Sequence, residues 1–493
     1  MRIALFSAGA GRMYCGSCLQ SGSLAAALSR EGYDAVVVPL YAPLRLEDET
    51  QSARPVAFGA ISAYLRACWP ALGWLARWAR PIVDHPAVLR WASRHGGAVR
   101  PERVGQLAVS VLEGESGPHR REIERLADHA ARELQPDVVH LSTALLAGFA
   151  GTLQERLGVP VVASLSGEDG FVERLGEPLR GEVRRRLARQ AAQLDALIAP
   201  SRYYADFMAD YLGVPGERIR VIRPGLRLDD RPAAAEDSLA ENDWNPATVA
   251  NPPQPASRRP AVVGFLSRVC REKGLALLAE AVCRLAADPA CPPVELRAAG
   301  YLDPADRAEL RAVERRMAAG GLADRFRYVG ELDLRAKREF LAQLDVFALP
   351  TLRPESKGLP VLEAWAEGVP VVASDHGALG EWMATTGGGV RCAPGNAESL
   401  ASALRGLLAD RPRAAQLGRQ ARRIVREQFT AERMAREMAE VYRALCNAPA
   451  GAVPSAAAAD VPATEAGQSA AADSATAGVT DRPDQQHERS TKR

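Results

Sequence analysis

The chain has 493 residues, of which 47% are hydrophobic and 25% are charged, as in ordinary folded globular proteins. Lys and Arg number 62 and Asp and Glu number 60, so the formal net charge of +2 gives no support for a dedicated nucleic-acid binder. No run of about 18 uncharged apolar residues occurs, and we therefore expect no transmembrane helix.

The chain opens with Arg2–Ser7, which predicts a buried strand that runs into the glycine loop Gly9–Gly11. This apolar run is too short for the core of a signal peptide, which favours a cytoplasmic protein. Continuous apolar runs recur through both halves of the chain with helical patterns between them, as expected for parallel strands buried on both faces. The sequence therefore predicts an α/β fold of two Rossmann-like, doubly wound domains.

Ten segments are predicted as strands, five in each half. Those of the first half are Arg2–Ser7, Ala35–Leu40, Asp137–Leu141, Val159–Leu165 and Ala196–Ala199. Those of the second half are Ala261–Ser267, Val294–Gly300, Phe326–Gly330, Val346–Pro350 and Val369–Ser374.

Composition separates the two halves from a linker and a tail. Residues 229–260 are rich in Pro, Ala, Asn and Asp, which sustain neither a helix nor a central strand, so they are interpreted as a linker. The first domain then covers residues 1–228 and the second covers residues 261–430. Residues 447–493 contain no Leu, Ile, Met, Phe, Tyr or Trp, and a tail with so little apolar surface is expected to be disordered.

A segment rich in Trp interrupts the pattern of the first half. Residues 64–95 hold four of the seven Trp of the chain, with Arg interleaved, and the apolar residues Leu65, Trp69 and Leu72 recur at helical spacing. The interpretation we favour is a helical insertion, over about residues 60–112, that packs on the first domain. The other is a surface for an amphiphilic acceptor or a peripheral contact with the inner membrane surface, where Trp and Arg are favoured.

The clearest motif follows the predicted strand Val346–Pro350. It places Glu355 in the next loop, Gly358 and Leu359 at the start of a helix, and Glu363 inside that helix. Free amides at a helix N-terminus favour an anion such as a diphosphate. Glu355 can accept hydrogen bonds from sugar hydroxyls and Glu363 from ribose hydroxyls. The alternative is one loop glutamate and one solvated helix glutamate.

A second motif, residues 264–274, follows the first predicted strand of the second half. It places Arg268 and Lys273 at the carboxyl end of the sheet, where open α/β sheets bind ligands. Two fixed cations there can neutralise a leaving diphosphate. Alone, the motif favours a solvated basic loop; together with the glutamate motif it favours a binding site.

These two motifs resemble those of retaining glycosyltransferases of the GT-B fold, specifically glycosyltransferase family 4. The resemblance extends over roughly residues 1–446. Supporting segments are Gly9–Gly11, Arg202–Met208, Ile222–Gly225, and His376-Gly377 with Glu381.

The resemblance implies transfer of a hexose from a nucleotide sugar, UDP- or GDP-linked, with retention of anomeric configuration. The implied diphosphate contacts are Arg268, Lys273, Gly358 and Leu359, and the implied contacts to the donor sugar and ribose are Glu355, Glu363 and Gly11. It also implies that the two domains face a cleft and that residues 431–446 form a helix crossing back to the first domain. No Asp-x-Asp pair stands at a strand end, so no metal and no other cofactor are expected.

The loop after the fourth predicted strand departs from the family pattern. Many relatives carry a His there, near the donor sugar, but residues 164–170 contain none. Glu168 or Asp169 can hydrogen-bond a sugar or acceptor hydroxyl instead, so both join Glu355 as candidate catalytic residues. His140, at the end of a neighbouring strand, is a weaker candidate.

Cys15 and Cys18 form a Cys-x-x-Cys pair at the first strand-to-helix turn. Redox activity and metal binding are both possible interpretations of such a pair, but no second Cys pair or His ligands at short spacing complete a zinc site. We favour a lining of the cleft. The expected partners are thus a nucleotide sugar and a glycan, lipid-linked or small-molecule acceptor. The alternatives are a sugar- or nucleotide-binding protein without activity, another enzyme such as an epimerase or phosphorylase, and a redox protein.

Overall fold

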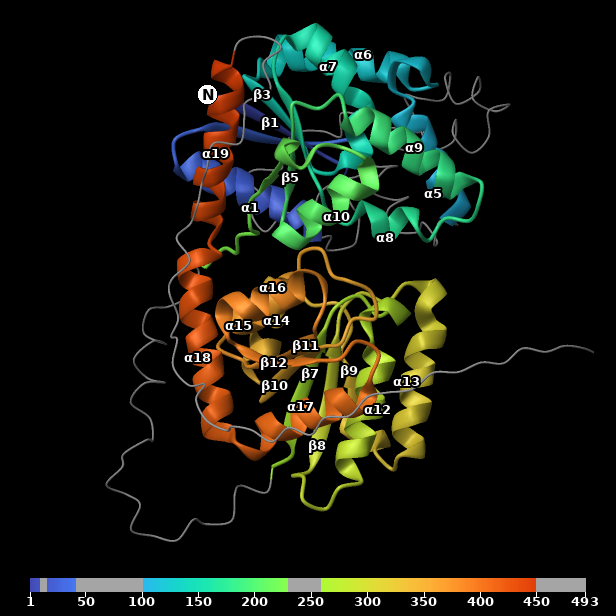
Figure 1. The fold of residues 1–493 in the computed structure, drawn as a ribbon, viewed down its shortest axis with the longest axis vertical. Helices are drawn as coiled ribbons and strands as arrows, with labels where there is room; N and C mark the ends of the chain where they lie inside the picture. The colour runs from blue at the N-terminus through green and yellow to red at the C-terminus, as the bar shows by residue number, and fades with distance from the viewer. Residues whose placement is uncertain (9–15, 41–100, 229–258, 449–493) are drawn as a thin grey trace, which may run out of the picture. The chain divides into compact units, whose positions relative to one another are not determined.

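The computed structural model describes residues 1–8, 16–40, 101–228 and 259–448. The segment 64–95, most of the linker, and residues 449–493 of the tail lie outside these ranges, as do Gly11 and Cys15. The predictions made for them therefore remain predictions. The described chain builds two parallel six-stranded sheets, so the predicted fold class is confirmed (Figure 1).

The first sheet has the strand order β2-β1-β3-β4-β5-β6, with every neighbouring pair parallel. Its strands are β1 Arg2–Ser7, β2 Asp34–Pro39, β3 Val138–Leu141, β4 Val161–Ser164, β5 Ala196–Ala199 and β6 Ile219–Val221. The described helices between them are α1 Gly16–Arg30, α5 Pro101–Leu112, α6 Arg120–His129, α7 Ala150–Leu157, α8 Glu168–Val172, α9 Leu179–Ala191 and α10 Arg202–Leu212.

The second sheet has the order β12-β11-β10-β7-β8-β9 and is also parallel throughout. Its strands are β7 Ala261–Leu266, β8 Val294–Ala299, β9 Phe326–Tyr328, β10 Val346–Leu349, β11 Val371–Ser374 and β12 Gly389–Cys392. Its helices are α12 Leu275–Ala286, α13 Arg307–Ala319, α14 Leu334–Ala342, α15 Leu359–Ala366, α16 Gly377–Thr386, α17 Ala397–Ala409 and α18 Arg411–Gln428.

All ten predicted strands are present, and two further strands, β6 and β12, were missed. Each is an edge strand of three or four residues with an Arg in its interior. An edge strand has one neighbour and need not be apolar on both faces, so it leaves no continuous apolar run in the sequence.

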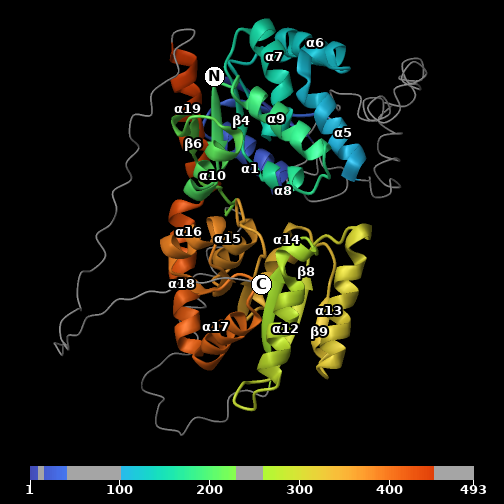
Figure 2. The same cartoon turned by 45° about the vertical axis from the view of Figure 1, so that its right-hand side comes forward.

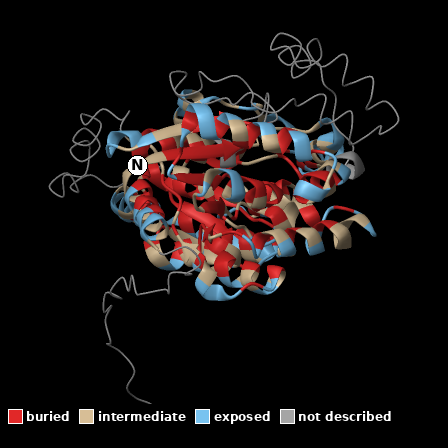
Figure 3. Cartoon of the chain, turned by 90° about the horizontal axis from the view of Figure 1, so that it is seen from above, coloured by how far each residue is buried: buried red, intermediate tan, exposed pale blue. Residues whose placement is uncertain are grey.

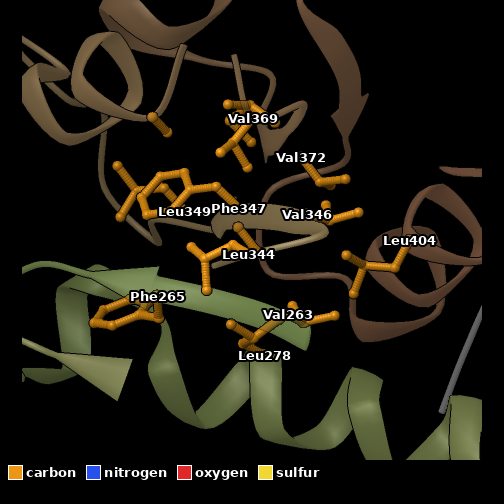
Figure 4. Close-up of a cluster of buried hydrophobic side chains, with 14 of the residues drawn as sticks. Val263, Phe265, Leu278, Leu344, Val346, Phe347, Leu349, Val369, Val372 and Leu404 are labelled. Carbon is orange, nitrogen blue, oxygen red and sulfur yellow. The ribbon is translucent and has the colours of Figure 1, made fainter. Parts of the chain in front are cut away.

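The core of each half consists of strands and the inward faces of helices, as the burial colours of Figure 3 show. In the second half Phe265 and Phe347 are fully buried on neighbouring strands, within the cluster drawn in Figure 4. Gly264 of β7 leaves room there for Leu344, because a Cβ at this position would overlap that side chain. Close packing of this kind holds β7 beside β10, the two strands whose loops carry the predicted motifs.

The last described helix, α19 Ala431–Asn447, packs on the first sheet although it follows the second in sequence. Its buried residues Met434, Met438 and Tyr442 join a cluster that contains Ile3 of β1 and Leu28 of α1. A separate cluster covers the other face of the same sheet. The first sheet is therefore covered on both faces, as a doubly wound fold requires, and one of the covering helices comes from the end of the chain (Figures 1 and 2).

Candidate functional site

A cavity of about 470 Å³ lies at the carboxyl ends of the second sheet's strands. The loops after β7, β8, β9 and β10 contribute Arg268, Gly300, Glu331 and Glu355 to its lining. Ser166, from the loop after β4 in the first half, lines it as well. Ligands of open α/β sheets bind at this edge, because several strand-to-helix loops converge there.

Lys273 and Glu355 form an ion pair within the cavity wall. Their side chains are only 24% and 14% exposed. Burial alone would raise the pKa of Glu355, but the Lys273 ammonium and the backbone N–H groups of Gly358 and Lys357 outweigh it and hold that pKa below its usual value. Glu355 is therefore an ionised, fixed hydrogen-bond acceptor.

Two glycines in left-handed conformations fix this pair in place. Gly274, at φ 79°, ends the turn that carries Lys273, and a Cβ there would overlap the carbonyl oxygen of Pro350. Gly377, at φ 61°, packs on the backbone of Glu355, where a Cβ would lie 2.6 Å from its nitrogen. Because glycine has no side chain, the backbone at both positions can approach the loop after β10 closely.

The N-terminus of α15 opens on the same cavity. Gly358 adopts φ 64° as the residue before the helix, and Leu359 and Pro360 form its first turn and line the cavity. The free backbone amides of a first helical turn carry a partial positive charge. Together with Lys273 they provide a place for a phosphate group.

Arg268 also lines the cavity, and its Nε is buried without a hydrogen-bond partner in the described part of the chain. A buried donor of this kind is satisfied when an anion enters. The structure thus brings Arg268, Lys273, Glu355, Leu359 and Glu363 to one cavity, as the sequence predicted.

Sequence reasoning missed the partner of Glu363. Lys337 of α14 contacts Glu363 Oε1, and Arg338 contacts Glu367 at 3.4 Å. No motif marks these cations in the sequence, because they reach the site only when α14 packs against α15.

The charges of the lining suit an anionic ligand. Cationic side chains outnumber carboxylates by two among the lining residues. The cations are Arg227, Arg268, Lys273, Lys337, Arg338 and Lys357, and the carboxylates are Glu331, Glu355, Glu363 and Glu367. A nucleotide-sugar diphosphate carries about two negative charges, which this excess balances.

Glu168 and Asp169 are placed differently from each other. The Glu168 side chain is buried and accepts hydrogen bonds from Thr143 Oγ1 at 2.6 Å, from the amide of Ala144 at 3.1 Å, and from Ser166 through both its amide and its hydroxyl. Because these hydrogen bonds occupy its acceptor sites, the Glu168 carboxylate is suited to holding the loop in place and less suited to contacting substrate.

Asp169 is less enclosed and accepts a hydrogen bond of 2.6 Å from the Tyr204 hydroxyl. Burial raises the pKa of Asp169, and the hydrogen bond from Tyr204 opposes that rise only in part. Its loop lies against the Glu355 loop, because a Cβ at Gly167 would lie 3.4 Å from Ser356 Oγ.

His140 is buried in the first half, with Nδ1 2.5 Å from the Tyr442 hydroxyl and Nε2 2.8 Å from Ser164 Oγ. Burial lowers the pKa of His140 to about 4, so the ring is neutral at pH 7. A neutral imidazole has one N–H donor and one acceptor, which suits two hydroxyl partners. This arrangement favours a structural role for His140.

Glu381 of α16 accepts hydrogen bonds from the amides of Arg202 and Tyr203, at 3.2 and 3.1 Å. A carboxylate at the N-terminus of α10 is stabilised by the helix dipole. Among the described residues no group of three or more His, Cys, Asp or Glu is arranged to hold a metal ion. Nor is any described helix long and apolar enough to cross a membrane.

Comparison with known proteins agrees with this geometry. Residues 250–424 match the family described as glycosyl transferases group 1, and residues 84–230 match glycosyltransferase family 4. Glycogen synthase of Mycobacterium tuberculosis is 30% identical over 318 residues, which cover 64% of this chain and 70% of that protein.

Solved structures share the fold. Sucrose-phosphate synthase from Thermosynechococcus elongatus superposes with a TM-score of 0.65 at 18% identity, over 90% of this chain and 98% of that one. Anabaena HepE, solved in complex with UDP-glucose, superposes with a TM-score of 0.59 at 18% identity, over 90% of this chain and all of that one. On the family matches and the fold together, the chain belongs to glycosyltransferase family 4 and is a GT-B glycosyltransferase, a hexosyltransferase that transfers a sugar from a nucleotide sugar.

Proposed function

We propose that this enzyme transfers a hexose from a UDP-linked donor, with retention of anomeric configuration, to a glycan or amphiphilic acceptor. The observation that carries the proposal is the Lys273–Glu355 ion pair at the N-terminus of α15, beside Arg268 in one cavity. Within the proposal Arg268, Lys273 and the first amides of α15 bind the diphosphate and stabilise it as it leaves. Glu355 then contacts the donor sugar and Glu363 the ribose.

UDP is favoured over GDP because HepE, which shares the fold, binds UDP-glucose. We further propose that the reaction needs no metal, since the cationic side chains of the cavity supply the charge that a divalent ion supplies elsewhere. The acceptor then binds on the side of the first half, near Asp169, and closure of the cleft excludes water. A cytoplasmic location, with peripheral membrane contact through residues 64–95, belongs to this proposal and rests on the sequence alone.

For the loop after β4 we propose distinct roles. Asp169 hydrogen-bonds a hydroxyl of the acceptor or donor, because it lies on the loop whose Ser166 lines the cavity. Glu168 holds that loop. A role for Gly11, Cys15 or Cys18 at the cleft remains a prediction from the sequence. Replacing both Cys by Ser tests the redox alternative, which requires loss of activity with donor binding intact.

Slow hydrolysis of the donor without acceptor tests the proposed function directly. We expect the protein to release UDP from UDP-glucose, and the first glucose released to be the α anomer by proton NMR, since the donor carries an α linkage. Lys273→Ala removes a diphosphate contact and is expected to lower the rate and the affinity for UDP at least tenfold, about 1.4 kcal/mol.

Arg271→Ala serves as the matched control, since Arg271 is exposed on the same turn as Lys273. We expect it to behave as wild type. If wild-type protein binds neither UDP nor GDP, or if Lys273→Ala binds like wild type, the proposal is wrong. Release of the β anomer first contradicts retention alone.

A further inference from the structure

Lys337 forms the closest polar contact to Glu363 and belongs to no recognised motif of this chain. It lies on α14, which starts at an Asp333 cap whose side chain accepts from the amide of Ala336 at 2.8 Å. From there Lys337 Nζ reaches Glu363 Oε1 on α15. The two side chains are 16% and 20% exposed, and both line the cavity.

The geometry points to Lys337 as a positioning residue for recognition of the donor ribose. It holds Oε1 of Glu363, so that Oε2 is left to accept hydrogen bonds from the ribose hydroxyls of a nucleoside diphosphate. This inference rests on the proposed function, since it deepens the role of the same cavity.

One reason is that the two carboxylate oxygens of Glu363 differ in their hydrogen bonds. Lys337 engages Oε1, and Oε2 has no further hydrogen bond within the described residues. An ionised carboxylate accepts only, and each oxygen has two acceptor sites. The ion pair therefore holds one oxygen of the carboxylate, and the other oxygen keeps its acceptor sites in a side chain that lines the cavity.

A second reason is electrostatic. An unpaired carboxylate at Glu363 would place a negative charge in the cavity that must accept a diphosphate, and like charges in a partly buried site repel strongly. Lys337 neutralises that charge without removing the acceptor. Lys273 does the same for Glu355 in the same cavity, so each of the two carboxylates expected to contact the donor is paired with a lysine.

A role in joining α14 to α15 does not by itself explain why Lys337 contacts Glu363. Arg338 already links α14 to α15 through its contact with Glu367. Arg338, the residue after Lys337, thus supplies a bridge between the two helices. Lys337 instead contacts Glu363, which lies one turn nearer the start of α15 than Glu367 does.

The test measures binding of UDP, 2′-deoxy-UDP and 3′-deoxy-UDP to the full-length protein by calorimetry. We expect wild type to bind UDP about tenfold more tightly than at least one deoxy form. Lys337→Met is expected to weaken UDP binding about tenfold and to abolish most of that preference. Lys337→Arg keeps the charge and is expected to restore the preference to within about threefold of wild type.

A double-mutant cycle identifies the partner. In a Glu363→Gln background, Lys337→Met is expected to change UDP affinity less than about twofold, because the carboxylate through which it acts is gone. The matched control is Arg335→Met, an exposed basic residue of the same helix, whose ion pair among the described residues is with Glu339 one turn on. It is expected to bind all three nucleotides as wild type does.

Equal weakening of UDP and both deoxy forms in Lys337→Met overturns the inference, since it indicates an attraction to phosphate without ribose recognition. Unchanged binding overturns it too, and so does a full effect that persists in the Glu363→Gln background. If wild type binds GDP instead of UDP, the series is run with GDP and its deoxy forms and judged in the same way. A wild type that binds neither nucleotide overturns the proposed function and the role of Lys337 together.

Discussion

Gly274 is the residue on which the position of Lys273 depends. It has φ 79°, and a side chain there would overlap the Pro350 carbonyl at the end of β10. The close approach lets the turn after β7 reach the loop after β10, so that Lys273 meets Glu355. A glycine here therefore serves the site through backbone geometry.

Gly274→Ala is expected to destabilise the protein by on the order of 3 kcal/mol, from left-handed strain and from overlap with Pro350. Because the turn must shift to relieve the overlap, we also expect weaker UDP binding. Thermal unfolding with and without UDP measures both effects.

Gly406→Ala is the control for this change. Gly406 lies inside α17, its φ is ordinary and a Cβ would meet nothing within 4 Å. An alanine there is expected to stabilise the protein by about 0.5–1 kcal/mol. A Gly274→Ala protein as stable as wild type, with the same UDP affinity, would show that the turn tolerates a side chain.

At the scale of elements, α19 is attached to the first sheet by packing and by one buried polar network. Tyr442 of α19 meets His140 at the end of β3, which in turn meets Ser164 at the end of β4. His140 and Tyr442 also pack edge to face, with ring centroids 5.9 Å apart. Since this network is buried, a charge on His140 would be placed where no described partner can balance it.

The network predicts a loss of stability in acid. The folded pKa of His140 is about 4, below the usual 6.5, so folding favours the neutral ring. Its contribution is fully present above about pH 6.5 and is lost as pH falls through about 4, a difference on the order of 3 kcal/mol. Chemical unfolding between pH 7 and 4 measures it.

His140→Asn cannot gain this charge. It is expected to be less stable than wild type at pH 7 but to lose less stability as the pH falls. His129→Asn, a change at an exposed histidine of α6, is the control and should keep the wild-type dependence. Parallel curves for His140→Asn and wild type would contradict the assignment.

Much of this architecture could be predicted because its signals are local. A strand buried on both faces leaves an apolar run, and Glu355, Gly358 and Glu363 stand in one short segment after such a run. Their meeting with Lys273 follows from strand order, since β7 and β10 are neighbours.

The rest depends on packing between segments. Lys337 shares α14 with other basic side chains, and nothing local separates it from exposed Arg335; only the position of α15 does so. The sequence makes Glu168 a catalytic candidate because its loop lacks a His, but its hydrogen bonds with Thr143 and Ala144 depend on how two loops fold together and leave no trace in the sequence. Sequence patterns report burial and local conformation, while pairings across elements follow from tertiary contacts.

For the molecule as a whole, the order of elements along the chain differs from their order in space. The buried side chains of α19 complete a cluster with Leu5 of β1 and Leu24 of α1. The chain must therefore be made almost to residue 447 before this face of its first sheet, which α1 covers in part, is covered completely. Until then that face exposes apolar side chains, which favours aggregation of a partly made chain.

Two truncations separate this helix from the residues after it. Deletion after Ala448 keeps α19 whole and removes only the segment predicted to be disordered, so we expect unchanged unfolding temperature and unchanged release of UDP from UDP-glucose. Deletion after Thr430 removes α19 and uncovers the cluster around Met434, Met438 and Tyr442. Since loss of even one buried side chain of this size costs about 2–5 kcal/mol, this protein is expected to aggregate or to bind a hydrophobic dye strongly. Should it fold like wild type, α19 is dispensable to the first sheet; should the shorter deletion unfold the protein, the prediction of a dispensable tail is wrong.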